Sequence, residues 1–73
     1  MNLNNLISFY HIAKCNSISK ASKKLHITQP GLSSQLKNLE TELGYKLINR
    51  SNQGASLTPV GNIVFDYAKS IFK

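Results

Sequence analysis

The feature that most constrains the fold of this sequence is a row of leucines between Thr28 and Gly44. Leucines at i, i+4, i+7 and i+11 share one side of an α-helix, and here they are Leu32, Leu36, Leu39 and Leu43. Thr28 is a residue type that caps helix starts, Pro30 is tolerated in a first turn, and Gly44 suits a left-handed helix end. The pattern predicts one amphipathic helix on whose leucine face the other elements must pack.

Two further helices are predicted before this one. Apolar residues recur at helical spacing over residues 3–13 and indicate a first helix that ends near Asn16. Ser17 is a suitable N-cap for a short second helix with apolar residues at positions 18, 21 and 25. His26 and Ile27 then form a turn before Thr28. Two short helices joined by a tight turn describe a helix-turn-helix, here over residues 18–37.

After Gly44 the pattern changes to that of a hairpin and one more helix. Short apolar pieces at residues 47–48 and at Leu57 flank the turn-forming residues 51–54. Thr58 followed by Pro59 starts a fourth helix. The predicted fold is therefore mainly α. It consists of a winged helix-turn-helix over residues 1–58, with three helices and a two-stranded wing, and the start of an amphipathic linker or dimerisation helix over residues 59–73.

The charge distribution favours a polyanionic partner. The formal net charge is +6, and the five lysines of residues 1–39 are accompanied by no acid. Such a field attracts nucleic acid or an anionic membrane surface. No apolar run approaches the roughly 20 residues that cross a bilayer, and the single cysteine, Cys15, favours a reducing compartment. We therefore expect a cytoplasmic protein that binds double-stranded DNA and no membrane.

The face opposite the leucines suits entry into the major groove of DNA, because its side chains are small and polar and include no acid over the first two turns. Gln29 can offer two hydrogen bonds to an adenine edge, and Pro30 can contact a thymine methyl. The predicted base contacts are Gln29, Pro30, Ser33 and Ser34. The predicted contacts with the DNA backbone are Thr28, Lys37, Lys46, Arg50, Lys20 and Lys24, and the predicted wing tip is Asn52 and Gln53.

Over its whole length the sequence resembles the N-terminal DNA-binding domain of LysR-type transcriptional regulators. The matching residues are Leu6, Phe9, Ser17, Ala21, Leu25, Gln29, Pro30, Leu32, Ser33, Gln35, Leu39, Glu40, Leu43, Gly44, Leu47, Arg50, Leu57, Thr58 and Gly61. The resemblance implies a homodimer built on the fourth helix, and a downstream domain, absent here, that binds a small-molecule effector. Ser34, Gln53 and Gly54 stand where the family often has arginine, so Arg50 is the expected wing contact.

The fourth helix also predicts a dimer from its own pattern. Its apolar arc is about twice the ~100 degrees that a helix needs to cover one core. A chain of 73 residues is expected to leave Phe65 and Phe72 exposed unless a second copy covers them. The predicted dimer contacts are Val64, Phe65, Ala68 and Phe72.

Two other classes of function are an enzyme and a protein-interaction module. The sequence has no phosphate-binding loop, paired carboxylates or metal-ligand cluster, so no enzyme activity, cofactor or metal is predicted. The alternative is a winged helix that acts as a protein-interaction module without DNA binding, because fold alone does not determine function. The acid-free first half of the chain favours DNA.

Overall fold

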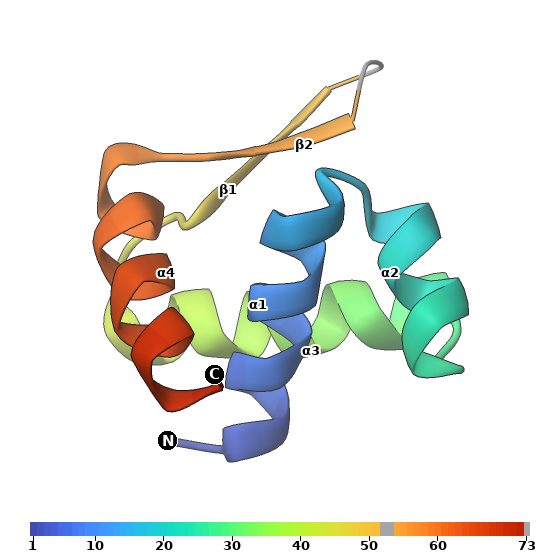
Figure 1. Cartoon of the computed structure of the whole chain (residues 1–73), viewed down its shortest axis with the longest axis horizontal. Helices are drawn as coiled ribbons and strands as arrows, with labels where there is room; N and C mark the ends of the chain where they lie inside the picture. Colours follow the sequence, from blue (N-terminus) through green and yellow to red (C-terminus); the bar gives the residue numbers. More distant parts are fainter. Residues whose placement is uncertain (52–53, 73) are drawn as a thin grey trace.

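The computed structural model describes residues 1–51 and 54–72. In these residues the order is α1 (Leu3–Cys15), α2 (Ile18–Leu25), α3 (Gln29–Leu43), β1 (Ile48–Ser51), β2 (Gly54–Leu57) and α4 (Pro59–Ile71) (Figure 1). The two strands pair antiparallel, with Ile48 opposite Leu57 and Ser51 opposite Gly54. This is a winged helix-turn-helix followed by a fourth helix, and the predicted fold class is confirmed.

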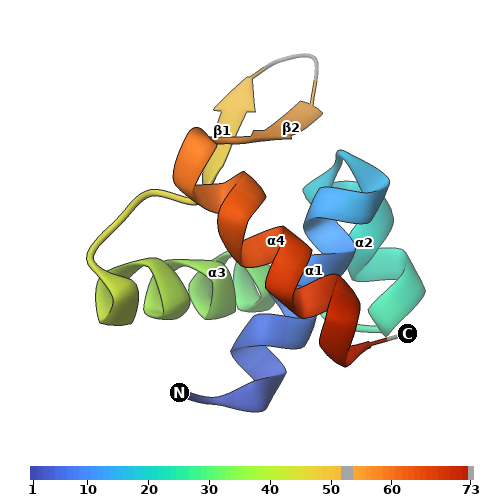
Figure 2. The same ribbon diagram turned by 60° about the vertical axis from the view of Figure 1, so that its left-hand side comes forward.

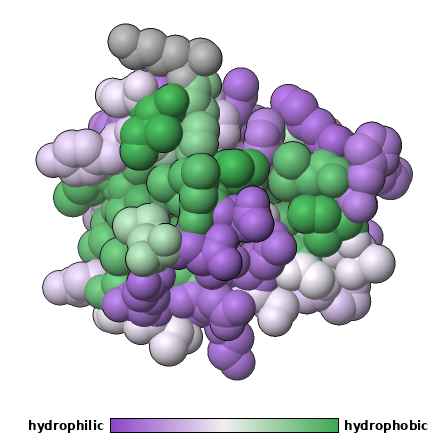
Figure 3. Space-filling model, turned by 90° about the horizontal axis from the view of Figure 1, so that it is seen from below, coloured by the Kyte–Doolittle hydropathy of each residue, from purple (hydrophilic) through white to green (hydrophobic). Residues whose placement is uncertain are grey.

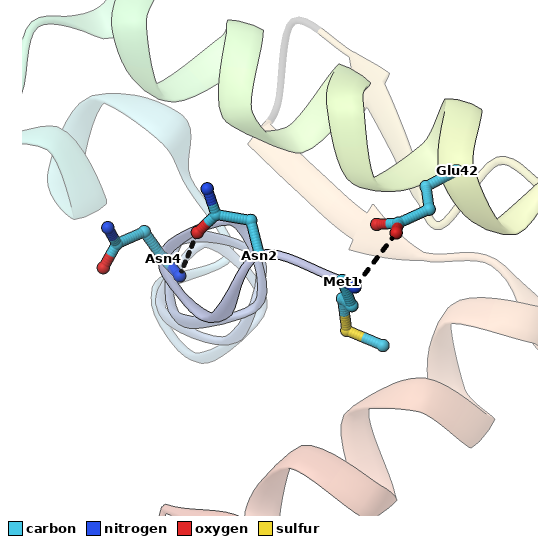
Figure 4. A network of polar contacts seen from close by, with 4 residues as sticks. All are labelled: Met1, Asn2, Asn4 and Glu42. Carbon is cyan, nitrogen blue, oxygen red and sulfur yellow. Dashed lines mark hydrogen bonds and ion pairs between the residues drawn. The ribbon is translucent and has the colours of Figure 1, made fainter.

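The helix boundaries follow from the capping residues. Hydroxyl side chains accept hydrogen bonds from the first-turn backbone at the three positions predicted, which are Ser17 for α2, Thr28 for α3 and Thr58 for α4. Gly44 ends α3 with a φ of +81°. Asn2 caps α1 by accepting the backbone N–H of Asn4 at 2.8 Å (Figure 4). Local chemistry therefore places each helix start.

The core lies around α1, on which α2, α3 and α4 all pack (Figures 1 and 2). The buried apolar residues are Leu6, Phe9, Tyr10, Ile12, Ala13, Ala21, Leu32, Leu36, Leu39, Leu47, Ile48, Ala55 and Ala68. Three of the four predicted leucines of α3 are in this set, and Leu43 is partly buried against it. The leucine row therefore turns its face to α1 and leaves the opposite face of α3 to solvent.

A polar contact joins α1 and α3 inside this packing. The hydroxyl of Ser8, which is 1% exposed, donates a hydrogen bond to Oε1 of Gln35. A buried hydroxyl needs a partner because it has lost its water. The pair therefore fixes α3 against α1 at one rotational setting.

Backbone contacts hold both ends of the wing. The N–H of Ala55 donates to the carbonyl of Asn16 at 3.0 Å, and the N–H of Thr58 donates to the carbonyl of Leu47 at 3.0 Å. Gly54 has a φ of +129°, and a Cβ there would lie 2.6 Å from the Asn16 oxygen, so only glycine fits. The wing is thereby tied to the end of α1 and to the start of α4.

α4 crosses α1 (Figure 2). The residues of α4 that we expected at a dimer interface pack against the core of the same chain. Ala68 is 1% exposed, and the rings of Phe65 and Phe72 lie 5.4 and 5.3 Å from the ring of Tyr10. Tyr10 thus covers part of both rings within one chain, and both phenylalanines are half-buried. Their role as dimer contacts stays a prediction. α4 instead exposes Ile63 (58%), Tyr67 (72%) and Ile71 (61%).

α4 therefore belongs to the same packed unit as residues 1–58, and a linker role for residues 59–73 stays a prediction. In the part of the chain that the structure describes, no helix combines the length and apolarity that crossing a membrane requires.

Candidate nucleic-acid interface

The four predicted base-contact residues lie on the first two turns of α3. Gln29, Pro30 and Ser34 are exposed, and Ser33 is half-buried at the margin. They share the solvent side because Leu32 and the following leucines hold the opposite side of the helix on α1. The structure thus presents a narrow surface of small polar groups at the N-terminal end of α3.

All five predicted backbone-contact cations are exposed, namely Lys20, Lys24, Lys37, Lys46 and Arg50. Lys37 and Lys46 line one hollow at the C-terminal end of α3, together with Glu40 and Tyr45. Arg50 lines a second hollow between the wing and the start of α2, beside Ser17. The exposed cations thus come from α2, α3, the segment before β1 and β1 itself, and cations are among the side chains that contact a DNA backbone.

The acids of α3 are occupied by donors within the fold. The carboxylate of Glu40 accepts the backbone N–H groups of Leu47 and Ile48 at 2.8 and 3.2 Å. The carboxylate of Glu42 pairs with the ammonium of Met1 at 3.1 Å, which is the only ion pair within residues 1–51 and 54–72 (Figure 4). Both carboxylates of α3 thus already have partners within the fold.

Of the remaining predicted contacts, Thr28 lies in the described part of the chain. Thr28 is exposed, and its oxygen accepts the N–H of Gly31 at 3.1 Å, which leaves its hydroxyl hydrogen available to donate to a phosphate. Asn52 and Gln53 lie outside the described residues. In Figure 3, hydrophilic residues lie at the upper right and at the lower centre of the surface, and hydrophobic residues reach the surface across the left and centre and in a further patch on the right.

His11 is half-buried on α1, and its Nδ1 is buried without a hydrogen-bond partner among the described residues. Burial lowers the pKa of His11 below its usual 6.5, and the positive charges of Lys24 and Lys14 lower it further. The fold therefore favours the neutral imidazole over the imidazolium. In the same described ranges, no three His, Cys, Asp or Glu side chains are grouped to hold a metal ion.

Sequence reasoning gave neither Glu40 nor Gln35 a structural role. The structure shows Glu40 bonded to the start of β1, and Gln35 bonded to Ser8. Both residues belong to the set that carries the LysR resemblance, and that was the one signal that marked them. Their roles depend on residues that are distant in the chain, so periodicity along one helix cannot show them.

The fold and its exposed face define a class, the winged helix-turn-helix with a basic surface around its third helix. A family model described as "Bacterial regulatory helix-turn-helix protein, lysR family" matches residues 3–62. The chain is 45% identical over 62 residues to the HTH-type transcriptional regulator YcgK of Bacillus subtilis, covering 85% of this chain and 19% of YcgK. It is 41% identical over 68 residues to the HTH-type transcriptional regulator BenM of Acinetobacter baylyi, covering 93% of this chain and 22% of BenM.

Solved structures agree with these relatives. A crystal structure of the BenM DBD in complex with catB site 1 DNA superposes with a TM-score of 0.93 at 39% identity, covering 99% of this chain and 81% of that chain. The oxidized form of Corynebacterium glutamicum OxyR gives a TM-score of 0.92 at 42% identity, covering 97% of this chain and 23% of that chain. The chain belongs to the lysR family of bacterial regulatory helix-turn-helix proteins, a family of regulators and not of enzymes. It spans 19% and 22% of the two full-length regulators YcgK and BenM.

Proposed function

We propose that this chain is the sequence-specific DNA-binding domain of a LysR-type transcription regulator that acts in the cytoplasm. The observation that carries the proposal is the exposed face of α3, where Gln29, Pro30 and Ser34 are open to solvent, together with the exposed cations of α2, of α3 and of the wing. A helix that enters the major groove needs small polar side chains at its leading end and cations beside it to contact phosphates. The related BenM DBD, solved in complex with DNA, supports the same assignment.

In the proposed mechanism, one set of residues reads bases and a second set contacts phosphates. Gln29 presents an amide that can pair with both hydrogen-bonding groups of an adenine edge, and Ser34 presents a hydroxyl that is less discriminating. Lys37, Lys46 and Arg50 contact phosphates, which sets the register of α3 on the duplex without reading sequence. Specificity is therefore expected to depend on Gln29, and salt sensitivity on the cations.

A salt titration tests this function. If a dimer makes about six to eight phosphate contacts, its affinity for duplex DNA falls by roughly 10³-fold or more between about 50 and 200 mM salt. Lys37→Ala should lower the slope of log affinity against log salt, whereas Lys69→Ala, which removes the same charge from α4, should not. A flat titration with wild-type protein would contradict DNA binding and would favour a protein-interaction module.

We also propose that the domain binds DNA as a homodimer through α4. The proposed contact surface is the exposed row of Ile63, Tyr67 and Ile71, which stand at i, i+4 and i+8. Ile63 and Tyr67 also line a surface hollow together with Asp66 and Ser70. A second copy fits this row because a two-fold axis sets identical apolar stripes against each other. The same axis directs two α3 helices towards successive major grooves.

This contact surface replaces part of the one expected from sequence. Ala68 is buried, and Phe65 and Phe72 cover Tyr10 in the same chain. Val64 is half-buried against the core and stays a candidate for the edge of the interface. Sedimentation equilibrium at several protein concentrations, with and without operator DNA, measures the association. A chain that stays monomeric under both conditions would contradict the dimer.

A further inference from the structure

One carboxylate connects α3 to the wing. Oε2 of Glu40 accepts the backbone N–H groups of Leu47 and Ile48, at 2.8 and 3.2 Å. Both donor residues are buried, with exposed fractions of 0% for Leu47 and 1% for Ile48. Ile48 is the first residue of β1, so this side chain of α3 holds the wing at the point where it begins.

The same segment is held from the other side by α4. Thr58 donates its hydroxyl hydrogen to the carbonyl of Lys46 at 2.6 Å and its N–H to the carbonyl of Leu47 at 3.0 Å. The most extensive packing of α3 is on α1 and α2. The two hydrogen bonds from Glu40 are thus a direct polar connection between α3 and the start of the wing.

We infer that Glu40 is a positioning residue, which sets the placement of the wing relative to α3 so that Arg50 and the exposed face of α3 reach one duplex together. The inference rests on the proposed DNA binding. Arg50 follows Ile48 by two residues on β1 and pairs with Ala55, whose N–H donates to the carbonyl of Asn16. Arg50 is thus positioned by two anchors, and the loss of the Glu40 bonds releases the one at the start of β1.

Hydrogen bonds to an ionised acceptor are among the stronger ones in proteins. Removal of the Glu40 carboxylate also leaves two buried N–H donors without a partner. The population of wing positions other than the native one should then rise about 10- to 100-fold. Glu40→Gln keeps an oxygen at this position and should change that population much less, whereas Glu40→Ala removes the acceptor.

The first test is a double-mutant cycle on operator DNA. Arg50→Ala should weaken the binding of operator DNA by about tenfold, because it removes one phosphate-contacting cation. In the Glu40→Ala background the same change should weaken binding less than about threefold, because the wing contact is already lost. In the Glu42→Ala background, which removes a carboxylate from the same helix on another side, and in Glu40→Gln, the tenfold loss should return. An equal Arg50→Ala loss in the Glu40→Ala and wild-type backgrounds would overturn the inference.

The second test needs no DNA. Amide hydrogen exchange should accelerate about 10- to 100-fold at Leu47 and Ile48 in Glu40→Ala, while the amide of Leu36 keeps its wild-type rate. Uniform acceleration across α1 and α3 would overturn the inference, because Glu40 would then be a general stability residue. If wild-type protein binds no DNA but the exchange pattern is as expected, the proposed function fails and the control of the wing by Glu40 stands.

Discussion

A substitution at Gly61 tests the close backbone contact between α4 and Leu47, in the segment before the wing. A Cβ added at Gly61 would lie 2.1 Å from the carbonyl oxygen of Leu47, which also accepts the Thr58 N–H at 3.0 Å. Gly61→Ala must therefore push α4 away from Leu47. The lost hydrogen bond destabilises by about 1–3 kcal/mol and the overpacking by about as much again. Alanine regains up to about 1 kcal/mol as a better helix former.

The free energy of unfolding of Gly61→Ala should thus fall by about 1–5 kcal/mol, a large share of the stability of a small domain. Urea unfolding followed by circular dichroism measures this change. Gly31→Ala is the matched control, because its Cβ would meet only side-chain atoms, Oγ1 of Thr28 at 3.0 Å and Cγ2 of Ile27 at 3.3 Å. That variant should stay within about 1 kcal/mol of wild type. Equal stability of Gly61→Ala and wild type would refute the reasoning.

Three further predictions concern base recognition, the dimer and pH. Gln29→Ala should lose about 1–3 kcal/mol on the preferred site and relax preference at one base pair; an equal loss on random duplex would mean that Gln29 reads no base. Tyr67→Glu should reduce self-association in sedimentation with little change in urea unfolding, whereas Phe65→Ala, which is half-buried on the core, should lose up to about 3 kcal/mol of stability. The two variants behaving alike would argue against the proposed α4 interface. Because the folded chain lowers the pKa of His11, the unfolded chain binds its proton more tightly. The contribution of neutral His11 to the free energy of unfolding is therefore fully present above about pH 6.5 and declines as the pH falls towards the folded pKa. His11→Gln should flatten this pH dependence of stability, and an unchanged pH profile would contradict the argument.

Much of the fold is readable from the sequence because its determinants are local. Ser17, Thr28 and Thr58 cap helices where their neighbours leave unpaired N–H groups, and Gly44 ends α3 in a conformation that other residues avoid. The leucine row of α3 identifies the face that packs and, by opposition, the face of Gln29 and Ser34 that stays exposed. The position of the candidate site on α3 could therefore be predicted, although its contacts with DNA stay predictions.

The positions of the helices and the hairpin, and the polar side of α3, can be predicted from local signals, because caps, turns and a narrow apolar stripe act within a few residues of chain. Which part of the broad apolar arc of α4 is covered depends instead on tertiary packing. That choice depends on how α4 crosses α1, which sets Phe65 and Phe72 on Tyr10 and leaves Tyr67 exposed. The bond from Glu40 to the start of β1 was likewise decided by tertiary structure, because a hydrogen bond between separate elements depends on where folding places them, and periodicity carries no such information.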